Sequence, residues 1–438
     1  MIRKRSAISS QHSAVKAVLV VAMFLTAAVI ANAQTVVIKG GKVLTVTHGT
    51  IEDGVVVMEN GRITAVGPTS SIKLPANAQV IDAKGMTIYP GLIDSETHLG
   101  LTEVSADKMT NDLIETSDEI MPHMHVYDAF HAETMLIPVA RVNGITNAIV
   151  APDSGDTLPG QDIFIQLDGK SAKEMILVKD ITMPLNFTGE QRRNESFDKA
   201  KYPQTRMGMA AQLRQAFLDA QDYLQKQSDY EKKSKTDKTA TAPKRDLKLE
   251  ALLPYLKGER PVVLAANTAP DVETAVSVAN EFHLKFILNH VQHAQKALDY
   301  IASLKVPVIV GPIWELPKEM DRYDAVYSLP AELQKRGVKV IIASDDAHNV
   351  RNLPYQAGYS VAYGLPYDEA LRAITLYPAQ AFGVDKDYGS LDVGKVANIV
   401  VANGDPLDVK TDVKHVFIAG REIPLDNRQI RLRDEYSK

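Results

Sequence analysis

The hydrophobic pattern changes character twice along the chain. From Thr35 to about Pro90, short apolar runs alternate with turn signals, and Asn60 and Gly61 stand between two of these runs. Asn-Gly between apolar runs is a strong hairpin signal, because both turn positions need a positive φ. From about Tyr388 the same β-type texture returns. The pattern therefore predicts one small β-domain built from both ends of the chain.

Between these ends, apolar runs of strand length alternate with helical stretches. Such runs are typical of parallel strands covered by helices, which form either a barrel or an open sheet. No glycine-rich phosphate-binding fingerprint follows any of them, which disfavours a nucleotide-binding open sheet. The expected strands are residues 89–98, 144–152, 261–267, 284–290, 306–312 and 338–346, and the expected helices include 271–282, 294–304 and 367–375.

A charged excursion, residues 202–250, interrupts this alternation. It begins with a helical segment, residues 207–226, and continues as a polar run over residues 228–246. A run of this composition is typical of a solvated loop. We therefore expect a charged insertion between elements of the larger domain.

The first 33 residues have the three parts of a secretory signal. A basic leader precedes the apolar run 17–30, and Ala31-Asn32-Ala33 matches the small-residue cleavage pattern. The apolar run is short for a bilayer span, which needs about 20 residues. We expect a signal peptide, 1–33, cleaved after Ala33, and a periplasmic or secreted protein with no stable membrane anchor; an uncleaved anchor is the alternative.

Charge and cysteine content narrow the classes of function. The chain has 438 residues and a formal net charge of −5. The leader contributes four positive charges and no negative ones, so the mature chain would carry −9. This balance argues against a nucleic-acid partner. Cysteine is absent, which excludes disulfides, thiolate metal ligands and a cysteine nucleophile.

Three stretches resemble a known family. YPGLIDSETHLGL (89–101), VIIASDDAHN (340–349) and the long segment 364–401 are similar to the amidohydrolase superfamily, in its imidazolonepropionase-like and prolidase-like branch. The resemblance implies an α/β fold, a (β/α)8 TIM barrel over residues 91–387, with a small composite β-sandwich domain from 34–90 and 388–438. It also implies divalent-metal hydrolysis of amide or related bonds.

The first stretch places three polar side chains in one strand. Because alternate residues of a strand face the same side, Asp94, Glu96 and His98 are expected to project into the barrel mouth. The family normally has His-x-His where this chain has Glu96-x-His98. Glutamate is a competent oxygen ligand for zinc. We therefore take His98 and Glu96 as candidate metal ligands, the alternative being hydrogen-bonded residues of a degenerate site.

The second stretch supplies the candidate base. By resemblance, Asp345 matches the metal-binding aspartate that accepts the proton of the attacking water. Asp346 competes with it in the adjacent register, and either carboxylate could instead cap the next helix. His290 matches the histidine that ends strand 6 and is the third ligand candidate. His293 is expected to be an exposed non-ligand.

Other ligands of the family are missing. The strand 5 His-x-His appears as Ala265-x-Asn267, and no metal-bridging lysine stands out, Lys179 being the nearest candidate. We expect His123, His125 and His131 to be surface residues rather than a replacement cluster of metal ligands. With His98, His290, Asp345 and Glu96 remaining, the number of ligands predicts one divalent metal ion, zinc, rather than two, the alternative being that no metal binds.

Two functions are compatible with this sequence. The first is a periplasmic hydrolase that cleaves a small amide, dipeptide or cyclic amide with a metal-activated water and Asp345 as base. The second is a non-catalytic family member that acts as a binding or partner-stabilising module, because fold does not imply function. The expected partner is a small-molecule substrate. Homo-oligomerisation and pairing with a related amidohydrolase both stay open.

Overall fold

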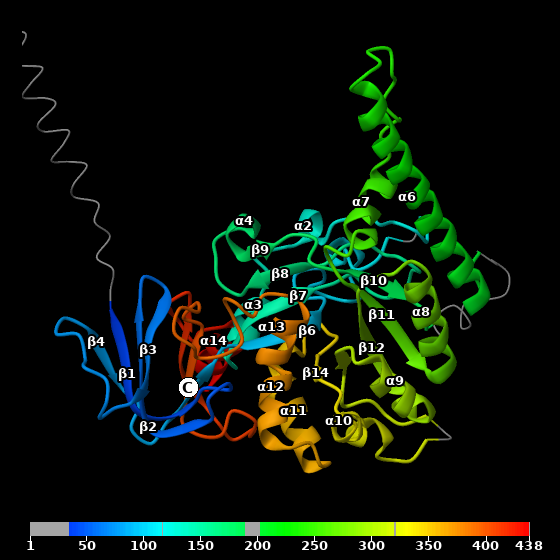
Figure 1. Cartoon of the computed structure of the whole chain (residues 1–438). Coiled ribbons are helices and arrows are strands. Elements are labelled where there is room, and N and C mark those ends of the chain that lie inside the picture. The colour runs from blue at the N-terminus through cyan, green and yellow to red at the C-terminus, as the bar shows by residue number, and fades with distance from the viewer. Residues whose placement is uncertain (1–34, 116, 189–201, 319–320, 438) are drawn as a thin grey trace, which may run out of the picture.

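The computed structural model describes residues 35–115, 117–188, 202–318 and 321–437. The expected signal peptide and its cleavage point lie outside the described residues. A β-sheet domain lies beside a larger α/β body, and the chain ends near the boundary between them (Figure 1). None of the described helices is long and apolar enough to cross a bilayer.

The smaller part is a mixed sheet with strands from both ends of the chain. Its order is β17-β16-β15-β5-β1-β2-β3, with β4 also paired to β1. β15 pairs antiparallel with β5, so the C-terminal strands continue the N-terminal ones. The strands are β1 (Val36–Leu44), β2 (Thr50–Glu59), β3 (Arg62–Pro68), β4 (Gln79–Asp82), β5 (Thr87–Pro90), β15 (Ile399–Ala402), β16 (Val413–Ile418) and β17 (Arg421–Ile423).

The predicted Asn-Gly hairpin is confirmed. Asn60 and Gly61 connect the antiparallel strands β2 and β3 with φ values of 53° and 77°. Positive φ at both positions matches the right-handed twist of the flanking strands.

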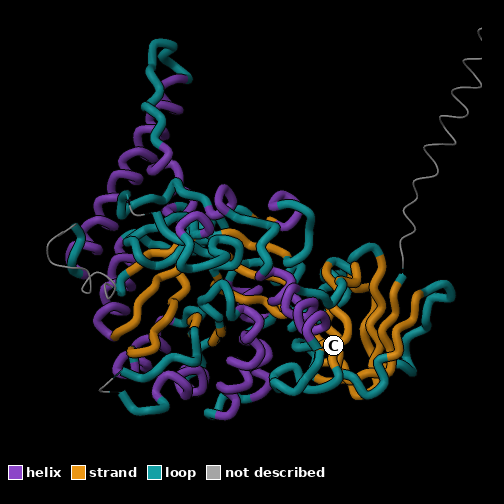
Figure 2. The backbone as a smooth tube through the Cα atoms, turned by 180° about the vertical axis from the view of Figure 1, so that it is seen from behind, coloured by secondary structure: helices purple, strands orange, loops and turns teal. Residues whose placement is uncertain are grey.

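The larger body contains two further sheets. A parallel five-stranded sheet has the order β10-β11-β12-β13-β14, and its strands are buried. A four-stranded sheet has the order β6-β7-β8-β9. Their bounds are β6 (Leu92–Thr97), β7 (Ile145–Val150), β8 (Ile163–Gln166), β9 (Ile176–Val178), β10 (Met183–Asn186), β11 (Val262–Thr268), β12 (Phe286–His293), β13 (Val308–Val310) and β14 (Val340–Ile342). Figure 2 shows helices around these strands.

The expected regular (β/α)8 barrel needs correction. In the described chain the strands form two sheets rather than one closed barrel, and β8 and β9 run antiparallel to their neighbours. The connection between β7 and β8 has turns but no helix. A parallel return would need a crossover, usually helical, so the chain turns back instead. Backbone hydrogen bonds still link the sheets at both junctions, from Asp345 to Glu96 and between Asp162 and residues 181–182.

Helices cover the body, and one pair projects from it. The helices are η1 (Lys108–Thr110), α2 (Val126–Ala129), α3 (Leu136–Arg141), α4 (Ala172–Met175), α6 (Arg206–Ser234), α7 (Leu247–Leu256), α8 (Ala269–Glu281), η3 (Gln295–Ala297), α9 (Leu298–Leu304), α10 (Ala325–Lys335), η4 (Val350–Asn352), α11 (Leu353–Ala362), α12 (Tyr367–Ala373), α13 (Leu376–Ala381) and α14 (Arg428–Tyr436). The expected loop at 228–246 is partly wrong, because α6 runs on to Ser234.

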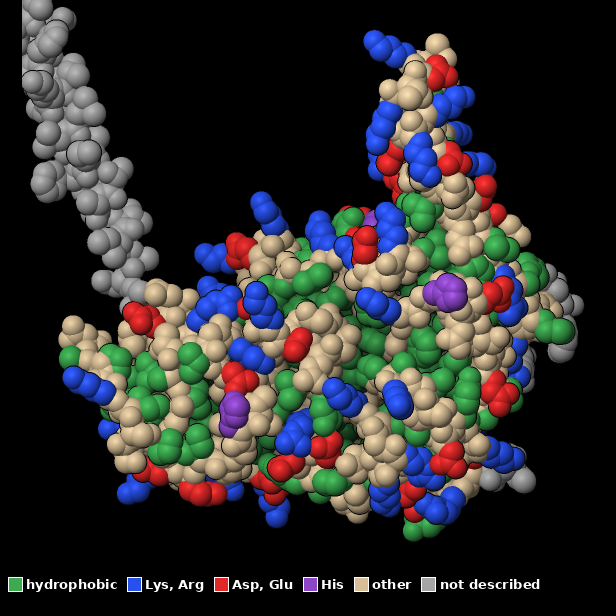
Figure 3. Space-filling model, viewed as in Figure 1, with side chains coloured by type: hydrophobic (Ala, Val, Ile, Leu, Met, Phe, Trp, Pro, Cys, Tyr) green, Lys and Arg blue, Asp and Glu red, His purple; other side chains and the backbone are tan. Residues whose placement is uncertain are grey.

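The projecting arm, formed by α6 and α7, is fixed at its base. Its tip is covered by charged side chains (Figure 3). At its base Phe217 packs on Phe282, and Arg206 forms an ion pair with the fully buried Asp271. Asp271 also accepts from the backbone N–H and hydroxyl of Thr268, which caps α8. The first half of α6 is therefore part of the core, and only its far half is solvated.

Candidate functional site

The site forms where β6 and β14 meet at their carboxyl ends. The N–H of Asp345 donates to the Glu96 carbonyl over 3.0 Å, and the N–H of His98 donates to the Asp346 carbonyl over 3.2 Å. These bonds bring residues far apart in sequence into one row. His98 Nε2 lies 3.6 Å from Asp345 Oδ1 as a result.

The end of β12 completes the arrangement. His290 Nδ1 lies 3.9 Å from Asp345 Oδ2, so each oxygen of this carboxylate faces a different imidazole. The side chains of His98, His290 and Asp345 keep 14, 11 and 22% of their surface exposed, so solvent reaches them. The structure therefore brings together the three residues that sequence reasoning selected from three strand ends.

Three of the nine described non-glycine residues with a positive φ lie at this mouth. His290, Val291 and Asp345 have φ values of 69°, 50° and 48°. A left-handed backbone is uncommon for residues other than glycine, and each such residue costs about 1–3 kcal/mol unless its surroundings fix it. Strain of this kind clusters at functional sites, so it marks the same mouth independently of the side chains.

Glu96 is buried beside this trio and bonded to an amide. The side-chain N–H of Asn289 donates to Glu96 Oε2. Burial and the charge of Asp345 raise the pKa of Glu96 to about 7, although His290 and Asn289 act against this. The Asn289 amide therefore hydrogen-bonds a Glu96 oxygen that the sequence analysis assigned to a metal ion.

The pKa values of Asp345 and His290 are both raised. Burial raises the pKa of Asp345 to about 6, with His290 opposing and the neighbouring carboxylates of Asp153 and Glu315 adding to it. Burial alone would lower the pKa of His290, but the charges of Asp345 and Glu96 outweigh it, so this pKa is raised. Asp345 is thus suited to accept a proton near neutral pH and His290 to give one.

Asp94 has a structural role in this site. Its Oδ1 accepts from the Ser344 N–H over 3.0 Å, and its side chain is fully buried. Burial raises the pKa of Asp94 to about 7. The expected projection of Asp94 into the mouth is therefore wrong, because this carboxyl group fastens β6 to the segment that follows β14.

The structure separates the two adjacent aspartates. Asp346 Oδ1 accepts from the backbone N–H groups of His348 and Asn349 over 2.6 and 3.2 Å. Asp346 therefore takes the turn-capping role that sequence reasoning had left open for either residue. Asp345 is left to face the imidazoles.

A resident metal ion does not fit these side chains as they are arranged. His98 Nδ1 hydrogen-bonds the Ala151 carbonyl over 2.9 Å and so leaves Nε2 free, as in a metal-binding histidine. Yet His98 and His290 approach different oxygens of Asp345. Among the described residues, no three His, Cys, Asp or Glu side chains are placed to hold one ion.

The remaining candidates lie apart from the trio or in other roles. Ala265 is buried and pairs with Asn289 across β11 and β12, so an apolar methyl group stands at the strand 5 position. The Lys179 ammonium lies 3.9 Å from the centre of the Tyr127 ring. The expectation that His293 is exposed is wrong, since its side chain is 6% exposed and bonds Asp321 over 2.6 Å.

The three loop histidines do not replace the missing ligands. His131 is exposed, whereas His123 and His125 are partly buried. His125 Nδ1 lies 2.7 Å from Asp180 Oδ1, and the ring stacks on Tyr127. This pairing accounts for His125 without a metal ion.

Sequence reasoning missed the polar residues that surround the trio. Asn289 gave one signal, because it directly precedes His290 at the same strand end. Asp153 and Glu315 gave none, since they lie in irregular connections after β7 and β13. Their effect on Asp345 depends on how these connections fold over the mouth.

The chain is similar to known amidohydrolases. Residues 287–423 match the Amidohydrolase family model. The chain is 28% identical over 396 residues to amidohydrolase tasK of Hapsidospora irregularis, covering 84% of this chain and 39% of that protein. It is 54% identical over 56 residues to an imidazolonepropionase of Geobacillus kaustophilus, covering 12% of this chain and 13% of that one.

A solved structure extends the similarity to the whole fold. An amidohydrolase from Thermotoga maritima superimposes with a TM-score of 0.82 at 28% identity, covering 90% of this chain and all of that one. Residues 287–423 therefore resemble the Amidohydrolase family, and the chain shares the overall fold of that solved amidohydrolase over 90% of its length. The family and these homologues are hydrolases that act on carbon–nitrogen bonds.

The contact between Asn289 and Glu96 generates a prediction. Asn289→Asp keeps the shape of the side chain but replaces the donor by a second buried carboxyl group. We expect the free energy of unfolding to fall by about 2 kcal/mol at pH 8, because a buried acceptor loses its partner and meets a like charge. The new carboxyl group has a raised folded-state pKa, so the loss should shrink as the pH falls toward 5.

Urea denaturation of both proteins at pH 8 and pH 5 measures this difference. Asn77→Asp, at an exposed site in the β-sheet domain, is the matched control and should change stability little. Equal stability of Asn289→Asp and the native chain at pH 8 would show that the amide does not hold Glu96.

Proposed function

We propose that this protein is an amidohydrolase-family hydrolase that cleaves a small amide, such as a dipeptide or a cyclic amide, at the mouth formed by β6, β12 and β14. One observation carries the proposal: the Asp345 carboxylate lies between two imidazoles at strand carboxyl ends, where barrel enzymes assemble their sites. The family relationship supports the reaction class.

Asp345, His290 and His98 have different roles in the proposed hydrolysis. Asp345 accepts a proton from a water molecule, whose oxygen attacks the amide carbonyl carbon. His290, with its raised pKa, donates a proton to the departing nitrogen as the carbon–nitrogen bond breaks. His98, fixed by its bond to Ala151, orients the water on the other side of Asp345.

Superfamily members generally use divalent metals, often zinc. The described side chains of this chain do not offer a three-ligand cage, so the steps above use only its own residues. A single zinc ion at His98, His290 and Asp345, with Glu96 or water completing its shell, stays a prediction from the resemblance.

The second candidate is a non-catalytic member that binds a small molecule or stabilises a partner. The buried methyl group of Ala265 and the hydrogen bond from the Asn289 amide to Glu96 favour it, because both remove capacity to bind a metal ion. Self-assembly and pairing with a related amidohydrolase are further proposals.

The adjacent aspartates provide a test of catalysis. Asp345→Asn should lower hydrolysis of the best substrate in a panel of dipeptides and cyclic amides at least about 100-fold, because the water loses its base. Asp346→Asn keeps the oxygen that caps the turn and should stay within a few-fold of the native rate. The hydrolysis rates of both variants are measured as product release by mass spectrometry. Equal losses in both variants would show that Asp345 is not the base.

Metal content tests the single-ion prediction. Elemental analysis of the purified protein should find no more than one equivalent of divalent metal, and His98→Ala should remove it without unfolding the chain. Two equivalents in the native protein, or full content in His98→Ala, would refute the assignment. A native protein with full activity and no metal would support hydrolysis by side chains alone.

Export remains a proposal based on the first 33 residues. We expect the mature chain to begin at Gln34 and to be recovered from the periplasm. N-terminal sequencing of the protein from fractionated cells measures this. An intact Met1 on membrane-bound protein would show an anchor instead.

A further inference from the structure

A cavity of about 900 Å³ lies at the other end of the parallel sheet from Asp345. We call it the basal cavity. Its wall includes Arg260, Lys285, Pro307 and Lys339, which stand just before β11, β12, β13 and β14. Lys339 and Asp345 flank the same strand, and an extended segment of that length spans about 20 Å. The basal cavity is therefore separate from the candidate site.

Positive charge gathers around the basal cavity although the chain as a whole is acidic. Its lining has one acidic residue, Glu259, and five basic ones: Arg260, Lys285, Lys305, Arg336 and Lys339. The two arginines have carboxylate partners, since Arg260 lies 3.9 Å from Asp180 and Arg336 lies 2.7 Å from Asp299.

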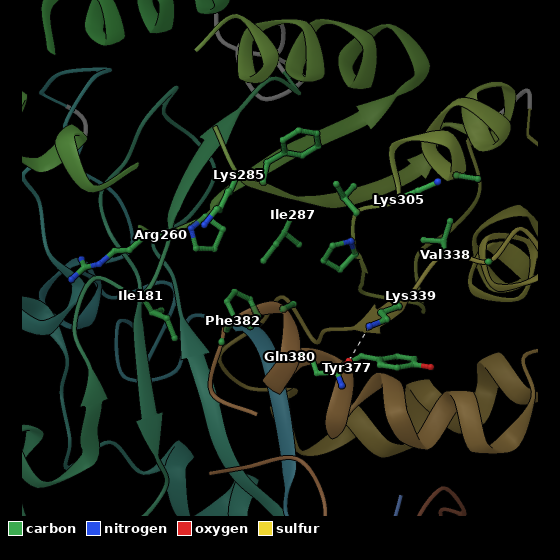
Figure 4. A pocket seen from close by; sticks show the side chains of 18 of the residues that line it. Ile181, Arg260, Lys285, Ile287, Lys305, Val338, Lys339, Tyr377, Gln380 and Phe382 are labelled. Carbon is green, nitrogen blue, oxygen red and sulfur yellow. Dashed lines mark hydrogen bonds between the residues drawn. The ribbon is translucent and has the colours of Figure 1, made fainter. Parts of the chain in front are cut away.

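The three lysines are not neutralised in the same way. Lys339 Nζ donates to the neutral amide of Gln380 over 3.1 Å, as Figure 4 shows. Within the described ranges, neither Lys285 nor Lys305 forms an ion pair. Lys305 ends α9 with a left-handed φ of 56°, a position that usually belongs to glycine or asparagine. Three lysines on three elements therefore line one cavity without forming ion pairs among the described residues, and Glu259 is the single acidic residue of the lining.

The wall between the lysines is apolar. Ile181, Ile287, Val338 and Phe382 lie around the basal cavity with the ring of Tyr377 (Figure 4). Ile287 and Phe382 belong to the cluster that fills the interior between the sheets. A ligand with an apolar body would cover these side chains while its charged groups met the lysines.

We propose that the basal cavity binds a small soluble organic anion with at least two negative charges and an apolar or aromatic body. Its volume matches pockets that enclose small molecules. A concave surface lined by one sign of charge attracts ligands of the opposite sign. Because no acid–base group of the mouth reaches it, the bound anion acts as a ligand and not as the substrate.

1-Naphthyl phosphate is a suitable probe, since it combines an aromatic body with a dianion. Calorimetric titration of the full chain should show one site, with affinity falling as salt rises. The Lys285→Met and Lys339→Met double variant should bind at least tenfold more weakly. The Lys84→Met and Lys410→Met double variant removes the same charge from exposed sites in the β-sheet domain and should bind like the native protein.

Further arms separate the basal cavity from other sources of binding. Uncharged 1-naphthol and inorganic phosphate should each bind more weakly than 1-naphthyl phosphate, and Asp345→Asn should bind it normally. Lys305→Gly suits the left-handed backbone and should also weaken binding, which provides a second test if the double variant does not fold. Unchanged affinity in the folded lysine variants, equal affinity for 1-naphthol, or loss of binding in Asp345→Asn would overturn the proposal.

Discussion

The candidate site depends on the join between β6 and β14. These strands are far apart in sequence, and the parallel bridge between Thr97 and Asp346 is what aligns their carboxyl ends. The bond from the Asp345 N–H to the Glu96 carbonyl fixes the register, and Asp94 reinforces it through the Ser344 N–H. A slip of one residue would turn Asp345 away from His98 and place Asp346 there, because adjacent strand residues face opposite sides.

This join also explains the polar character of the interior. Asp94 and Glu96 are buried and Asp345 is partly buried beside them, and burial raises the pKa of each. Isolated buried carboxylates are costly, so their retention requires compensating contacts. Ser344, Asn289 and His290 provide such contacts in turn. The same network that lowers the cost of burial places His290 beside the Asp345 carboxylate, which are the proton donor and the base of the proposed hydrolysis.

Local features of the sequence predicted local features of the fold. The Asn60-Gly61 hairpin was predictable because turn chemistry is set by two residues. The parallel strands were predictable because their burial on both faces leaves continuous apolar runs. The antiparallel β8 and β9 were not, because their direction depends on the connections between them. The far end of α6 was missed because its charged residues are also typical of loops.

The site was predictable only in outline. Family resemblance selected His98, His290 and Asp345, and the structure brings these three together. It could not assign Asp345 and Asp346 to their separate roles, because the difference lies in which carboxylate meets the backbone of His348. Nor could it reveal that Asn289 bonds Glu96, since this contact depends on the register between distant strands.

In the proposed hydrolysis, water attacks a substrate carbonyl beside Asp345, between His98 and His290. A crystal structure with a phosphinate dipeptide analogue tests this most directly, because a tetrahedral group mimics the hydrated amide. We expect the phosphinate oxygens to lie within hydrogen-bond distance of Asp345 and His290. A phosphinate bound away from these side chains, with the mouth left to solvent, would contradict it.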